Sequence, residues 1–268
     1  MEYVIEDKKP SYSGPSVNEL IKNFDFLSRM DQKNQIIGRE EEINLLEESF
    51  YKKRMKNTLL VGPAGCGKTT IVENIAYILK NKYVFLQFDV GGSVAGTKYR
   101  GEFEQRIHNV LKQIMKYNEC HEKPIVLFID EAHSLYKAGG AEGAIDASNI
   151  LKPYLSKGDI TLVGATTDYE YEHTIKKDLA LSRRLSPIFI KPLEKEQVLN
   201  ILKKFSEESV SDIGLEYIYN SSLTIPNSCN PDISIEILDR CLARKECRGV
   251  DITSGMVNEI VNYIKKSR

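Results

Sequence analysis

The sequence lacks both a charge imbalance and long apolar runs. Its 37 basic side chains are matched by 38 acidic ones, so nucleic acid or an acidic membrane surface is not expected as the main partner. No apolar run approaches the length of a membrane span, and the charged residues 1–10 contain no signal-peptide core. We therefore expect a cytoplasmic protein without a membrane partner.

Cysteines are few and scattered. The five thiols form no CxxC pair, which argues against a disulfide framework and against a zinc site. They are Cys66, Cys120, Cys229, Cys241 and Cys247. The pattern is typical of a protein in a reducing compartment.

The length of 268 residues predicts one large domain with a smaller one attached. Residues 1–16 are polar and indicate a flexible leader. Leu20, Ile21, Phe24 and Leu27 have the spacing of a short amphipathic helix over residues 17–29. We assign residues 1–34 to the leader and this helix, residues 35–190 to a large α/β domain, and residues 191–268 to a helical lid domain.

Five short apolar runs, rich in β-branched residues, alternate with helical patterns in the large domain. Continuous runs of this kind are typical of strands buried on both faces of a parallel sheet flanked by helices. The runs are 58–61, 83–88, 125–129, 160–163 and 187–190. Beyond residue 192 only helical periodicity remains. The expected fold class is α/β, with a parallel five-stranded sheet followed by an all-helical lid.

A glycine-rich loop follows the first of these runs and precedes a helical pattern. This context is the one that a P-loop requires, so a chance glycine turn is a poor explanation. The backbone of such a loop and the helix N-terminus bind phosphates, a lysine reaches the β- and γ-phosphates, and a hydroxyl ligates Mg²⁺. The residues expected to bind ATP are Gly62, Pro63, Ala64, Gly65, Cys66, Gly67, Lys68 as the lysine, Thr69 as the Mg²⁺ ligand, and Thr70.

Two carboxylates follow the apolar run 125–129. Asp130 is expected to hold Mg²⁺, and Glu131 to orient and deprotonate the attacking water. Acidic residues at a strand end are often only helix caps, but two of them after a buried strand, downstream of a P-loop, favour ATP hydrolysis. His133 is interpreted as structural, because Glu131 already fills the role of the base.

Seven segments, in order, resemble the first ATPase ring of the Clp protein unfoldases and disaggregases, which are AAA+ ATPases. The segments are 36–43, 62–69, 98–104, 127–133, 141–146, 164–167 and 183–184. The resemblance implies ATP hydrolysis in a homo-oligomeric ring, expected to be hexameric, that acts on a polypeptide substrate or an adaptor protein. It also implies nucleotide contacts from Ile36, Ile37, Ile201 and Pro231.

The resemblance assigns further roles near the γ-phosphate. Thr167 corresponds to the family's first sensor, a hydroxyl that holds the attacking water, although a threonine at this place is commonly a loop cap. Arg183 and Arg184 correspond to paired arginine fingers that act on the neighbouring subunit's ATP. Such fingers accelerate hydrolysis by roughly 10³ to 10⁵ in other nucleotidases. A solvated charge pair is the simpler alternative.

The resemblance also places Lys98, Tyr99 and Arg100 in a central pore loop, where the aromatic ring grips an extended polypeptide. Basic and aromatic residues could equally stack on a nucleic acid. Residues 137–146 resemble a second pore-facing loop.

The chain departs from the family in two ways. It has room for one ATPase module, without the N-terminal substrate domain and second ring of Clp proteins. Ile233 stands where many AAA+ proteins have a second-sensor arginine, and Arg240 is interpreted as a surface charge. Two alternative functions stay open: a regulatory or assembly ATPase that switches a partner without threading it, and a nucleic-acid motor or transposition helper.

Overall fold

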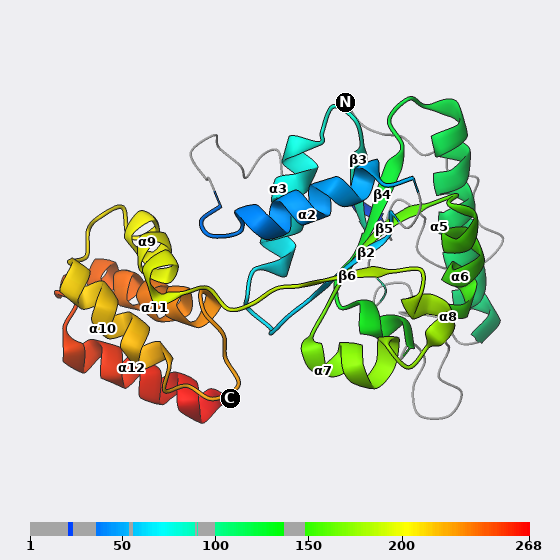
Figure 1. The fold of residues 1–268 in the computed structure, drawn as a ribbon. Helices are drawn as coiled ribbons and strands as arrows, with labels where there is room; N and C mark the ends of the chain where they lie inside the picture. The colour runs from blue at the N-terminus through cyan, green and yellow to red at the C-terminus, as the bar shows by residue number, and fades with distance from the viewer. Residues whose placement is uncertain (1–20, 24–35, 54–55, 89, 91–99, 137–147) are drawn as a thin grey trace. The chain divides into compact units, whose positions relative to one another are not determined.

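The computed structural model describes residues 21–23, 36–53, 56–88, 90, 100–136 and 148–268 (Figure 1). They belong to two compact units. The sheet unit comprises the described parts of Met1–Gln35, together with Glu41–Val61 and Thr69–Phe189; the lid unit comprises Ile36–Glu40, Gly62–Lys68 and Ile190–Arg268. Residues 62–68 of the P-loop therefore belong to the lid unit, although they follow a strand of the sheet unit directly in the sequence.

The sheet unit is built on six strands in the order β1-β3-β4-β5-β2-β6. The five strands β2 to β6 run parallel, as predicted, and β1 is antiparallel to β3. Their bounds are β1 (Ile21–Asn23), β2 (Thr58–Val61), β3 (Val84–Phe88), β4 (Ile125–Ile129), β5 (Thr161–Thr166) and β6 (Ser186–Phe189).

Strand β1 corrects the interpretation of the first part of the chain. Ile21 pairs with Phe88 and Asn23 with Leu86, where a helix over residues 17–29 was expected. The rest of that stretch lies outside the described residues. The edge of β3 presents unpaired backbone groups that a short extended segment can satisfy, and this pairing overrides the helical spacing of four apolar residues.

Helices cover both faces of the sheet, with α2 (Glu40–Tyr51) and α3 (Lys68–Ile78) on one side and α5 (Arg100–Cys120) and α6 (Ser148–Lys157) on the other (Figure 1). Every residue of β4 is buried. Alternate side chains such as Leu127 contribute to the core beneath α5 and α6. On the opposite side, the ring of Phe50 from α2 lies 5.8 Å from that of Phe85 in β3. Burial on both faces explains the continuous apolar runs of the sequence.

Short helical segments join the later strands. The 3₁₀ helix η2 (Ala132–Tyr136) follows β4, and α7 (Asp168–Glu170), the π-helical turn η3 (Tyr171–Ile175) and α8 (Leu179–Ser182) connect β5 to β6. The periodic patterns of the sequence gave no sign of these elements, because each is shorter than two helical turns.

The described part of the lid unit is helical, as predicted, and contains four helices. They are α9 (Lys195–Phe205), α10 (Asp212–Ser222), α11 (Asp232–Arg248) and α12 (Ser254–Ser267). Their apolar faces form one core that includes Leu202, Ile218 and Ile237. Gly249, at φ 64°, ends α11 in the left-handed conformation that glycine favours. Among the helices of the described residues, none is both long and apolar enough to cross a membrane.

Candidate nucleotide-binding and hydrolysis site

The glycines of the loop 62–68 have the backbone conformations that a P-loop needs. Gly65 has φ +80° and Gly67 has φ +94°, values that residues with a Cβ rarely adopt. A Cβ at Gly62 would lie 2.4 Å from the carbonyl oxygen of Ile190. Glycine is thus required by conformation at two positions and by close approach at the third, as in loops whose backbone N–H groups bind phosphates.

Lys68 is the first residue of α3 and is 9% exposed. Its Nζ donates hydrogen bonds to the carbonyl oxygens of Gly62 and Pro63, both at 2.8 Å. The ammonium group therefore folds back over its own loop. From there it can exchange neutral carbonyl partners for the phosphate oxygens of a nucleotide, which form stronger, charge-assisted hydrogen bonds.

Arg39 supports the loop, a role that the sequence interpretation missed. Its side chain is 4% exposed, and its Nη2 donates to the carbonyl oxygen of Cys66 at 2.7 Å. It directly precedes α2, where a cation interacts unfavourably with the helix dipole. The burial of an arginine in that position shows that a specific partner offsets this cost, and no local pattern of the sequence indicates it.

Helix α11 begins next to the loop within the lid unit. A Cβ on Gly65 would lie 2.7 Å from the Cβ of Asp232, the first residue of α11. Cys229 lies shortly before α11. Burial raises the pKa of its thiol, and the electrostatic effect of Cys66 raises it further. Ile233 is buried in the lid core, so the position that aligned with a second sensor faces away from solvent. An acidic residue, Asp232, is the group that meets the loop here.

The remaining residues expected to contact the nucleotide come from four separate segments of the sequence. Ile36 and Ile37 are half-buried in the segment that precedes Arg39, and Thr70 is exposed on α3. Ile201 is half-buried against the lid core, and Pro231 is the N-cap residue of α11. Their nucleotide contacts stay predictions.

A hydroxyl and a carboxylate come together at the carboxyl end of β4. Thr69 Oγ1 donates to Asp130 Oδ2 at 3.2 Å, which joins two residues that are 61 positions apart in the sequence. Mg²⁺ takes oxygen ligands in compact octahedral sets, usually one or two carboxylates or hydroxyls with water and phosphate oxygens. The pair has the donor types that fit a magnesium ion bound together with a nucleotide.

Glu131 has a left-handed backbone conformation with φ 53°. A residue with a Cβ is held there only when its surroundings impose it, and such conformations are common at functional sites. Its side chain is 63% exposed, and its Oε2 lies 3.1 Å from Nε2 of His133. The Nδ1 of His133 is in turn 3.2 Å from the hydroxyl of Thr166. His133 therefore fixes the carboxylate of Glu131, a contact that the sequence interpretation did not foresee.

Thr167 has a capping role in the structure. Its hydroxyl accepts a hydrogen bond from the backbone N–H of Glu170 at 3.2 Å, and it is the N-cap of α7. This is the alternative noted from the sequence. The sensor role of Thr167 stays a prediction, while the neighbouring Thr166 is the threonine that contacts the Glu131–His133 pair.

Arg183 and Arg184 lie between α8 and β6, at the amino ends of the parallel strands. Ile129 is level with Pro187 in the strand register, through Gly164 and Leu59. Arg184 precedes that level by three residues, and Asp130 follows it by one. With about 3.3 Å per residue and about 4.8 Å between neighbouring strands, the backbones of Asp130 and Arg184 are roughly 20 Å apart. The two arginines are thus remote from the carboxylates of their own chain.

A cavity of about 860 Å³ opens beside these arginines in the sheet unit. Its lining includes five basic side chains, Lys53, Lys56, Lys157, Arg183 and Arg184, together with Asp159. Arg184 also donates to the hydroxyl of Ser156 and to the carbonyl oxygen of Ala180. The excess of cations makes this hollow suitable for an anionic group.

The predicted pore loops cannot be placed. Lys98 and Tyr99 lie outside the described residues, and Arg100 begins α5 without a described side chain. Residues 137–146, expected to form the second loop, also lie outside.

The parallel sheet, the glycine loop closed by a buried lysine and the paired hydroxyl and carboxylate define the class of P-loop nucleotidases. Within that class, residues 58–193 match the family described as "ATPase family associated with various cellular activities (AAA)". The chain belongs to this family. The prediction of an ATPase is thereby confirmed.

Similar proteins extend the match over nearly the whole chain. It is 37% identical to the chaperone protein ClpB of Aquifex aeolicus over 91% of its length, and 35% identical to the ATP-dependent Clp protease ATP-binding subunit ClpC of Staphylococcus epidermidis over 96%. It covers 25% and 33% of these relatives. The predicted resemblance to Clp proteins is confirmed, although the chain spans only a quarter to a third of their length.

Solved structures of Hsp104 have the same fold. A closed-state reconstruction of Hsp104 with ATPyS and FITC casein superposes with a TM-score of 0.75 and 28% identity, over 93% of this chain and 45% of the other. The S. cerevisiae Hsp104-ADP complex gives a TM-score of 0.70 and 31% identity, over 85% of this chain and 33% of the other. These matches confirm the expected α/β fold with its helical C-terminal region.

Proposed function

We propose that this chain assembles into a ring, expected to be hexameric, in which ATP hydrolysis drives the threading or remodelling of a polypeptide. The observation that supports shared active sites most directly is the position of Arg183 and Arg184. Because the backbone of Arg184 lies roughly 20 Å from that of Asp130 in the same chain, these arginines are better placed for the nucleotide of another subunit than for their own. In a ring of identical subunits, every subunit presents the same edge to the next, so they can serve the neighbour's.

Each subunit contributes the binding and water-activating groups of its own site. Lys68 neutralises charge on the β- and γ-phosphates, and Glu131, held by His133, orients the attacking water and accepts its proton. Thr69 and Asp130, which lie 3.2 Å apart through Oγ1 and Oδ2, would hold Mg²⁺, and the ion would neutralise phosphate charge.

The neighbouring subunit contributes the guanidinium groups. The charge that develops on the transferred phosphoryl group is stabilised most effectively by a cation in a site from which water is excluded. The basic cavity beside Arg183 and Arg184 offers such cations to the phosphates of an adjoining copy. An isolated subunit is therefore expected to hydrolyse ATP slowly.

The proposal that the chain threads a polypeptide rests on the sequence pattern and on the names of its relatives. Tyr99 between two basic residues suits a gripping loop. The relatives are named as a chaperone and as the ATP-binding subunit of a protease, and one of the similar Hsp104 structures contains FITC casein. A polypeptide is accordingly the proposed substrate.

Ring formation can be tested with Glu131→Gln, which should bind ATP and hydrolyse it very slowly. Multi-angle light scattering with ATP and Mg²⁺ is expected to show a closed oligomer of about six subunits. Wild-type protein with ADP provides the comparison, since hydrolysis ends the ATP-bound state. A variant that stays monomeric while it binds ATP would refute the shared-site proposal.

Threading can be tested separately with FITC casein as the probe. Tyr99→Ala is expected to abolish stimulation of the ATPase by casein, whereas Tyr99→Phe keeps the aromatic ring and should retain most of it. If both variants match the wild type, the chain acts as a regulatory ATPase that switches a partner. ATPase activity that is stimulated by DNA and lost steeply with salt would instead indicate a nucleic-acid motor.

A further inference from the structure

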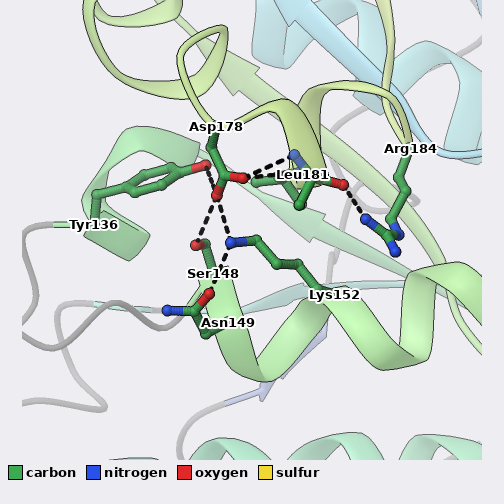
Figure 2. Close-up of polar contacts among 8 residues, drawn as sticks. Tyr136, Ser148, Asn149, Lys152, Asp178, Leu181 and Arg184 are labelled. Atoms are coloured by element: carbon green, nitrogen blue, oxygen red, sulfur yellow. Dashed lines mark hydrogen bonds and ion pairs between the residues drawn. The ribbon is translucent and has the colours of Figure 1, made fainter.

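Asp178 lies at the centre of a polar cluster in the sheet unit (Figure 2). Its Oδ2 accepts from Lys152 Nζ at 2.6 Å, from the Ser148 hydroxyl at 3.3 Å and from the Tyr136 hydroxyl at 3.4 Å. Its Oδ1 accepts from the backbone N–H groups of Ala180 and Leu181, both at 3.1 Å. One carboxylate thus joins the end of η2, the first turns of α6 and the start of α8.

The cluster is largely removed from solvent. The side chains of Asp178 and Lys152 are 15% and 18% exposed. Burial acts to raise the pKa of Asp178, but the hydrogen bonds from Lys152, Leu181 and Ala180 outweigh it and lower the pKa below its usual value. The carboxylate is therefore ionised at neutral pH, and its hydrogen bonds are of the stronger, charge-assisted kind.

Helix α8 depends on this carboxylate for its position. It has four residues, too few to be stable through its own hydrogen bonds. Asp178 is its N-cap, and an N-cap contributes about 1 kcal/mol to a helix. Arg183 follows directly as the C-cap residue, with Arg184 next. The contacts of Asp178 with α8 consequently determine the position of both arginines.

The same carboxylate contacts elements that lead to the hydrolysis site. Tyr136 ends the 3₁₀ helix η2, which begins directly after Glu131. Tyr136 and Ser148 also border residues 137–147, within which the second pore-facing loop was predicted. Helix α6 is also joined to the segment that follows α8, because Ser156 accepts a hydrogen bond from Arg184. Asp178 therefore contacts both the helix that precedes the two arginines and the end of the 3₁₀ helix that follows β4.

We propose that Asp178 is a positioning residue that holds α8 so that Arg183 and Arg184 meet the nucleotide of the neighbouring subunit. It touches neither nucleotide nor substrate and acts through the helix that it caps. The inference rests on the proposed ring, in which the arginines act between subunits.

The test uses Asp178→Ser, because serine also caps helix N-termini but is too short to reach Lys152 and Tyr136 together. The ATPase rate of the variant is expected to fall about tenfold, with ATP binding unchanged, as for partial loss of an arginine finger. Lys152→Gln removes the ion pair while it leaves the capping carboxylate in place, and should lower the rate less. Thermal unfolding of both variants identifies any loss of the fold.

Mixed rings distinguish a role between subunits from a role within one. An Asp178→Ser subunit has an intact hydrolysis site, and a Glu131→Gln subunit has intact arginines. In an equimolar mixture, about a quarter of all sites combine the two and should regain activity, so that the mixture exceeds the mean of its components. The control mixture combines Glu131→Gln with the Arg183→Ala, Arg184→Ala double variant and is expected to behave alike.

Three results would overturn the inference. Wild-type ATPase activity of Asp178→Ser would show that the cluster has no role in catalysis. Recovery in the control mixture alone would show that the arginines act between subunits but that Asp178 acts within its own, through Tyr136 and η2. Absence of recovery in both mixtures would refute the shared sites themselves, and the inference with them.

Discussion

Replacement of Arg39 by methionine is expected to weaken nucleotide binding without contact between that side chain and the nucleotide. Arg39 is 4% exposed and donates to the Cys66 carbonyl oxygen at 2.7 Å. Methionine fills similar space but leaves this carbonyl without its charged donor. Loss of a hydrogen bond from a charged group costs about 1.5 to 3 kcal/mol. If this cost falls on the nucleotide-bound loop, the Kd rises roughly 10- to 150-fold.

The assay is a titration with a fluorescent ADP analogue in the presence of Mg²⁺. Arg39→Lys keeps a cation and should give an intermediate Kd. Arg240→Met is the matched control: Arg240 is exposed on α11 and pairs with Glu236 four residues away, so its loss should change the Kd less than twofold. A folded Arg39→Met protein with wild-type affinity would refute the reasoning.

Three further predictions concern the hydrolysis site and the lid. His133→Ala should lower kcat about tenfold and have no further effect in Glu131→Gln, because the two side chains act as a unit; additive losses in steady-state kinetics would contradict this. In denaturant titrations, Glu131→Gly should be about 1 kcal/mol more stable than Glu131→Ala, since glycine adopts φ 53° without strain; equal stability would show that no strain exists. Burial raises the pKa of Cys241 from 9.0 to about 11. This thiol therefore stabilises the fold fully below pH 9, and the contribution, up to about 3 kcal/mol, is lost as pH rises towards 11. The stability of Cys241→Ala should accordingly fall less over this range than that of the wild type.

The parallel strands and the P-loop were predictable because each depends on a local pattern. A strand that is buried on both faces has to be apolar at successive positions, as in β4, and this leaves a continuous run in the sequence. Glycines at φ +80° and +94° are likewise required wherever the backbone turns in this way. Each pattern is complete within about ten residues, and one sequence suffices to read it.

The supporting contacts were not predictable, because they join distant residues. Arg39 and Cys66 are 27 positions apart, and His133 and Thr166 are 33 apart. The spacing of such pairs depends on the whole topology and leaves no local pattern. Strand β1 was missed for a related reason, since its pairing with β3 is decided by an open sheet edge and not by its own residues.

The two arginines between α8 and β6 differ in their contacts within the chain. Arg184 is half-buried and is bonded to Ser156 and to the Ala180 carbonyl, so it has to release its own chain before it reaches a phosphate. Each such bond contributes about 1 kcal/mol net, a cost that would be subtracted from any interaction in the transition state. Arg183 is exposed, and among the described residues its side chain forms no hydrogen bond or ion pair. We therefore expect Arg183→Ala to lower the ATPase rate more than Arg184→Ala, because Arg183 can reach the neighbour's nucleotide without first giving up contacts within its own chain.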